Sequence, residues 1–87
     1  MGTIWKFELL LVDRQVILMP KGAVVLSIHN QNDSLCLWAI VDGEAKKTDR
    51  WFEIIGTGNP VLEDHQRSFI GTVIMKPFVW HVFELDG

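Results

Sequence analysis

Hydrophobic and polar residues alternate with a period of two over short segments of the chain. In the first segment, Trp5, Phe7 and Leu9 would share one face of a strand. Lys6 and Glu8 would then share the other face. No long window sustains the i, i+3, i+4, i+7 spacing of an amphipathic helix. The pattern therefore predicts an all-β chain.

Turn-forming residues divide the chain into six or seven predicted strands. These strands are Trp5–Leu9, Gln15–Met19, Ala23–His29, Leu35–Val41, Arg50–Ile55, Phe69–Met75 and Phe78–Leu85. The polar break at residues 13–14 suggests that the first two form a hairpin, and the polar cluster at residues 30–34 predicts a chain reversal. The even spacing favours one small antiparallel sandwich or barrel over residues 1–87, with a short helical turn within 61–66 as an open alternative.

The segment Leu35–Val41 is apolar on both faces. A strand of this kind is expected in the centre of a sheet, with one face on the core. Its other face would be covered by a second layer or by a neighbouring subunit. Cys36 lies inside this segment, so we expect a buried, unreactive thiol.

Size and charge limit the classes of protein to consider. With 87 residues and a net charge of −3, the chain has room for one domain and lacks the basic surplus of a general nucleic-acid binder. No apolar run approaches the length of about 20 residues that a spanning helix needs, and no secretory signal is apparent. One cysteine allows no internal disulfide, which favours a cytoplasmic protein. So small a core favours association into at least a dimer.

Several short motifs occur in a characteristic order along the chain. They are residues 4–7 (IWKF), 13–15 (DRQ), 19–23 (MPKGA), 37–42 (LWAIVD), 56–60 (GTGNP), 71–72 (GT) and 78–84 (FVWHVFE). In this order they resemble a family of small uncharacterised proteins of tailed phages and prophages. The resemblance implies a phage or prophage origin, a compact domain and, for a phage-encoded protein, the cytoplasm of the host. It implies no catalytic residue.

Catalytic and metal-binding patterns are not apparent in the sequence. Ser, Thr and Cys residues form no recognisable nucleophile motif, and the three histidines are widely separated. We therefore expect no enzymatic activity, no metal and no cofactor. The weakest alternative is a nucleotide-degrading enzyme in which His81 acts with Asp42 or Glu84 as acid and base. A structural His81 with a hydrogen-bond partner is the simpler interpretation.

Two segments could instead form a binding site. Lys46, Lys47 and Arg50 place three positive charges just before Trp51. Trp38, on the preceding strand, would lie beside Trp51 if the two strands pair around this segment. Cations and an indole face together can bind phosphate and a base. A merely solvated hairpin tip would explain the same charges.

The second segment is the glycine-rich loop Gly56, Thr57, Gly58 and Asn59. Its backbone N–H groups could form a small anion-binding nest. The loop lacks the lysine and the spacing of a Walker motif, and a sharp turn would explain the same glycines.

These features favour a non-enzymatic binding protein. The first hypothesis is an oligomeric sponge that sequesters a host nucleotide immune signal: the three cations would hold phosphate, Trp38 or Trp51 would stack on the base, and the loop would donate hydrogen bonds. The alternative is a protein inhibitor of a host enzyme, or a structural accessory protein, with tryptophans as its anchors. Neither hypothesis involves a membrane or a long nucleic acid.

Overall fold

The computed structural model describes residues 2–86, which form seven β-strands. The strands are β1 (Thr3–Leu9), β2 (Arg14–Pro20), β3 (Val24–Gln31), β4 (Ser34–Val41), β5 (Lys47–Gly56), β6 (Arg67–Met75) and β7 (Phe78–Leu85). The all-β prediction is confirmed. The helical turn allowed within residues 61–66 is wrong, since the described residues contain no helix. The segment runs as turns instead, and its Asp64 is held by Arg14 rather than capping a helix.

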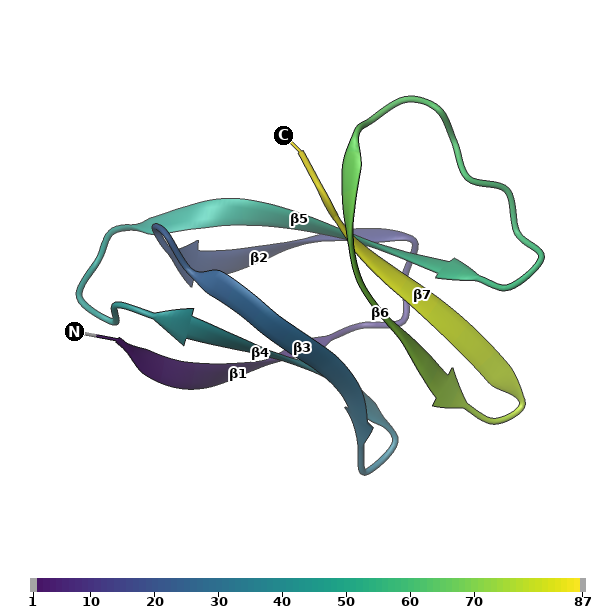
Figure 1. Ribbon diagram of the computed structural model, residues 1–87, viewed down its shortest axis with the longest axis horizontal. Helices are drawn as coiled ribbons and strands as arrows, with labels where there is room; N and C mark the ends of the chain where they lie inside the picture. The colour runs from purple at the N-terminus through teal and green to yellow at the C-terminus, as the bar shows by residue number, and fades with distance from the viewer. Residues whose placement is uncertain (1, 87) are drawn as a thin grey trace.

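The strands form two antiparallel sheets in a sandwich-like arrangement (Figure 1). One sheet has the order β1-β4-β3 and the other the order β2-β5-β7-β6. The predicted hairpin of the first two strands is therefore wrong: β1 pairs with β4, and β2 pairs with β5. The chain crosses between the sheets after β1, where the Gln15 side chain bonds both the N–H and the carbonyl of Leu10. Because β2 joins the other sheet, β1 pairs with one edge of the apolar β4 and β3 pairs with the other.

Two hairpins connect strands that are consecutive in the chain, and the first is the reversal predicted at residues 30–34. Asn32 and Asp33 join β3 to β4 with φ of 53° and 64°. Two consecutive residues with positive φ are typical of a type I′ turn, which matches the twist of a two-stranded ribbon. Lys76 and Pro77 join β6 to β7 in the second hairpin.

The core lies between the sheets, and β4 supplies much of it. As predicted, β4 is the central strand of its sheet. Alternate residues of β4 point inward and are almost completely buried: Leu35, Leu37, Ala39 and Val41. They belong to one cluster with Met19, Phe52 and Val82 of the opposite sheet. Cys36 points the other way and is also buried, with 2% of its surface exposed.

The two sheets approach most closely where β3 meets β6. A Cβ atom added at Gly71 would lie 2.8 Å from Cγ2 of Ile28, so no larger residue fits at position 71 without displacing Ile28. The glycine thus permits direct contact between the two sheets at this side of the sandwich.

Candidate functional site

The structure places the predicted cations and the predicted loop at opposite ends of β5. Lys47 begins this ten-residue strand and Gly56 ends it. At about 3.3 Å per residue, the two ends are roughly 30 Å apart. Lys46 lies beside Lys21, whose N–H donates to the Lys46 carbonyl at 2.7 Å. Lys46 and Lys47 therefore do not share a site with the glycine-rich loop.

The two candidate stacking residues lie on different sheets. Trp38 is on the outer face of the three-stranded sheet, where its ring centroid is 6.1 Å from that of His29. Trp51 is on β5 in the four-stranded sheet, on the face turned away from the buried Phe52. The expected pairing of Trp38 with Trp51 is wrong, because β4 and β5 are joined by a crossing between the sheets and not by a hairpin.

Arg50 faces inward and is already bonded within the protein. Its guanidinium forms an ion pair with Glu84 and donates from Nη1 to the carbonyl of Ala23 at 2.8 Å. The hydrogen bonds with Glu84 raise the pKa of Arg50 above its ordinary value. Because Ala23 precedes β3, the side chain connects one sheet to the start of the other. Arg50 acts here as a cross-link between the sheets.

The loop after β5 uses part of its hydrogen-bonding capacity internally. Thr57 N–H donates to the Val79 carbonyl at 3.2 Å, and Asn59 N–H donates to the Gly56 carbonyl at 3.0 Å. Gly58 adopts a φ of 92°, which favours glycine. The N–H groups of Thr57 and Asn59 are thus engaged within the protein, which leaves fewer donors for the anion nest than the sequence suggested.

His81 is held between two hydroxyl groups on the outer face of the four-stranded sheet. Its Nε2 lies 2.8 Å from the Thr57 hydroxyl, and its Nδ1 lies 2.9 Å from the Thr72 hydroxyl. Glu84 is on the inner face with Arg50, and Asp42 follows β4 in the other sheet. The acid–base set considered from the sequence is therefore not assembled around His81.

A charge network that the sequence did not reveal lies on the same outer face. Glu53, only 5% exposed, is bonded by Arg14 on one side and by Arg67 on the other, each at 2.8 Å. Arg14 also binds both carboxylate oxygens of Asp64, at 2.8 and 2.9 Å. Arg67 lies 3.7 Å from the same carboxylate. We call these four residues the Glu53 network.

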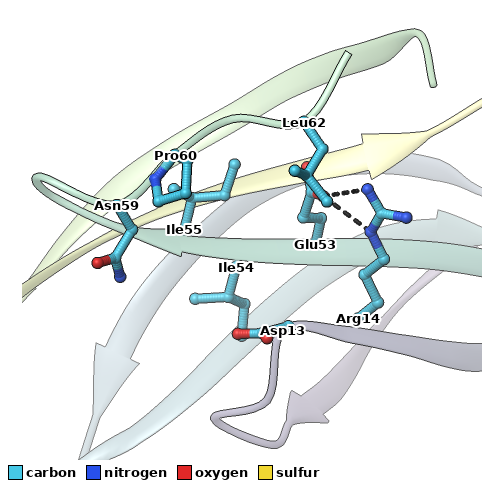
Figure 2. Close-up of a pocket in the computed structure, with 8 residues that line it drawn as sticks. All are labelled: Asp13, Arg14, Glu53, Ile54, Ile55, Asn59, Pro60 and Leu62. Carbon is cyan, nitrogen blue, oxygen red and sulfur yellow. Dashed lines mark hydrogen bonds and ion pairs between the residues drawn. The ribbon is translucent and has the colours of Figure 1, made fainter. Parts of the chain in front are cut away.

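The Glu53 network is neutral overall and holds the 57–66 loop on the sheet. Hydrogen bonds with Asp64 and then with Glu53 raise the pKa of Arg14. Arg14 in turn holds the pKa of Asp64 well below its usual range. Figure 2 shows Arg14 and Glu53 side by side, with Leu62 above them. The sequence signal for this network was the carboxylate of Glu53 within the otherwise apolar segment Trp51–Ile55.

An open hollow of about 270 Å³ lies beside the network (Figure 2). Its lining residues are Asp13, Arg14, Glu53, Ile54, Ile55, Asn59, Pro60 and Leu62. Arg14 and Glu53 of the lining are bonded to each other. The Asp13 carboxylate forms no ion pair within residues 2–86, so the unpaired charge in the lining is negative.

An apolar row crosses the outer face of the four-stranded sheet near the network. Trp51 lies opposite Val16 on β2 and opposite Leu85 on β7. Trp51 is 45% exposed, Val16 42% and Leu18, two residues along β2, 57%. We call Val16, Leu18 and Trp51 the Trp51 face. Beside it is a shallow hollow of about 300 Å³ lined by Arg14, Trp51, His65 and Leu85.

The other two tryptophans pack against the core, whereas Trp38 and Trp51 lie on outer faces of the sheets. Trp5 and Trp80 are partly buried against the core cluster.

Within residues 2–86, no three His, Cys, Asp or Glu side chains come together as a possible metal site. That part of the chain also has no helix long and apolar enough to cross a membrane.

Comparison with known proteins gives one result. No curated protein and no solved structure matches the chain significantly. A domain family does match, and the match covers residues 1–87. The chain therefore belongs to the family described as domain of unknown function DUF7352.

Proposed function

We propose that this protein is a non-catalytic binding module that recognises another protein through the Trp51 face. The observation that carries the proposal is the row of half-exposed apolar side chains centred on Trp51. Tryptophan is enriched among the residues that dominate protein interfaces, since it buries a large area at small cost in conformational entropy. Lys47 and Asp49, on the same face of β5, would form part of a polar rim around it.

The state of the charges favours a protein partner over a nucleotide. A phosphate site needs cations that are free to bind it. The cation that lines the hollow beside Trp51 is Arg14, which already binds Glu53 and Asp64. Arg50 is engaged by Glu84, and Lys46 and Lys47 lie away from the loop that would complete the site. We therefore rank protein recognition above the nucleotide sponge.

The proposal extends to origin and partner. The ordered motifs described above support a phage or prophage protein that acts in the cytoplasm of its host. Its partner would then be a host protein, or another phage protein, with an apolar surface that receives the indole of Trp51.

The test compares Trp51→Ala with Phe78→Ala on an immobilised protein exposed to host lysate. Both positions carry an exposed aromatic residue, 45% and 55% exposed, but Phe78 lies at the β6–β7 hairpin. We expect a partner that wild type and Phe78→Ala retain and that Trp51→Ala binds at least about tenfold more weakly, as for a hot-spot residue. Equal melting temperatures of the two variants would show that folding is intact.

Two results would contradict the proposal. The first is a partner retained equally by Trp51→Ala and wild type. The second is a rise in melting temperature with host nucleotide extract that Lys47→Ala abolishes, because a ligand bound only by the folded protein stabilises it. That second result would restore the nucleotide hypothesis.

A further inference from the structure

The four edge strands of the two sheets are not equally protected against pairing. β3 carries an irregularity between Val25 and Ser27, and β6 carries one between Phe69 and Gly71. β2 ends in Pro20, which has no N–H to donate. Bulges and prolines of this kind prevent an edge from pairing with another chain. Three of the four edges thus have a recognisable defence.

β1 has none of these defences. It is a seven-residue strand without proline that pairs with β4 in unbroken register from Thr3 to Leu9. In Figure 1 its free edge lies at the margin of the molecule, on the side away from β4. An extended edge of this kind presents unpaired backbone donors and acceptors to a second strand.

We propose that β1 pairs antiparallel with β1 of a second copy, which joins the two three-stranded sheets into one continuous sheet. This interface lies in the other sheet from the Trp51 face, and it does not rest on the function proposed above. The joined sheet would have six strands, an ordinary number for a sheet.

Symmetry restricts the possible registers. In an antiparallel pair, residues opposite each other lie on the same face of the sheet. A two-fold axis perpendicular to the sheet keeps each face on its own side, so one residue must lie opposite its own copy. The register is then defined by the residue at the centre, which must belong to β1.

The charges on β1 select one centre. Lys6 and Glu8 lie on the same face of the strand, two residues apart. A centre at Lys6 or Glu8 would place like charges opposite each other, which is destabilising. A centre at Phe7 places Lys6 opposite Glu8 of the partner subunit, and this pair occurs twice. Centres at Trp5 or Leu9 leave both charges opposite apolar residues or glycine.

The neighbouring residues fit the Phe7 register as well. Trp5 would lie opposite Leu9 of the partner subunit on the core side of the sheet. On the outer side, Ile4 is 57% exposed, and an added strand would cover part of this apolar side chain, which the single chain leaves in water. Within residues 2–86, Glu8 forms no ion pair, and Lys6 reaches only the amide of Gln31.

The test is the molar mass in solution of wild type and of charge-swapped variants. We expect wild type to have twice the chain's 10.0 kDa. Glu8→Lys places lysine opposite lysine at both positions and should raise the dimer dissociation constant by about tenfold or more. Lys6→Glu should do the same. The double variant Lys6→Glu with Glu8→Lys restores opposite charges in this register and should be a dimer again. Glu44→Lys, with the same change of charge in an exposed turn, is the matched control.

Each outcome decides the proposal. A monomeric wild type at high concentration would overturn it, as would a dimer that neither single swap weakens. Failure of the double variant to recover, with its melting temperature unchanged, would overturn the Phe7 register. If Glu8→Lys does not fold, Lys6→Glu and the double variant still provide the comparison. These results would leave the role of Trp51 untouched, because the variants do not alter its face.

Discussion

The Glu53 network and the charges of β1 differ in whether the charged side chains have oppositely charged partners within one chain. Both groups lie on the outer face of a sheet, in strands where apolar and polar residues alternate. Glu53 is covered by the 57–66 loop and is bonded by two arginines. Lys6 and Glu8 lie at an open edge, and the described residues give neither an oppositely charged partner. A covered charge needs its partner within the fold, whereas a charge at an open edge is available to a second copy.

The largest expected effect comes from removing the charge of Glu53. Glu53→Gln keeps the shape of the side chain but leaves Arg14 and Arg67 without their central partner. We expect the free energy of unfolding to fall by about 3 kcal/mol, since breaking a buried pair leaves uncompensated charge. For a domain of this size, that corresponds to a melting temperature lower by roughly 10 °C or more. Glu63→Gln, on the exposed loop, is the control, and an equal effect of both changes would refute the distinction between covered and open charges.

A smaller effect is expected at the ion pair between the sheets. Glu84→Gln weakens the bonds to Arg50, but both side chains keep 21% of their surface exposed. Partial solvation limits the loss of stability to about 1 kcal/mol. Chemical denaturation of this variant beside Glu53→Gln checks the order of the two effects. A larger loss for Glu84→Gln would mean that the sheets depend more on Arg50 than on the Glu53 network.

The smallest effect concerns Asp64 and depends on pH. The Arg14 guanidinium lowers the pKa of Asp64 in the folded protein, so the folded state favours the charged carboxylate. Its contribution to stability is present above the unfolded pKa of about 3.9 and is lost as the pH falls below that value. Asp64→Asn should therefore melt slightly below wild type at neutral pH, and the difference should shrink below about pH 4. A difference that is constant over this range would show that the carboxylate charge contributes nothing.

The sequence predicted those parts of the fold that local patterns determine. The alternation of apolar residues located the strands, and the polar cluster at 30–34 marked the β3–β4 turn. The sequence did not predict the neighbours of β1 and β2 correctly. Alternation reports which residues share a face, but the same pattern fits a β1–β2 hairpin and the observed β1–β4 pair. The choice depends on covering both edges of β4, which is a property of the whole fold.

The candidate site was less predictable for the same reason. Trp51 was identified, and it is indeed exposed. Its supposed companions, Trp38 and Arg50, depended on a hairpin that the fold does not contain. Arg14 and Glu53 are 39 positions apart in the chain, and no spacing rule joins them. Their contact follows only from the pairing of β2 with β5.

The most direct test of the claim that β1 is an open edge available to a second copy is amide hydrogen exchange measured along β1 and β2 at increasing protein concentration. Pairing of β1 with a second copy would protect the amides of β1 that point away from β4, so their exchange should slow as the concentration rises. The amides of β2, which ends in Pro20, should exchange at rates independent of concentration. Exchange along β1 that is fast and unchanged at every concentration would contradict the account.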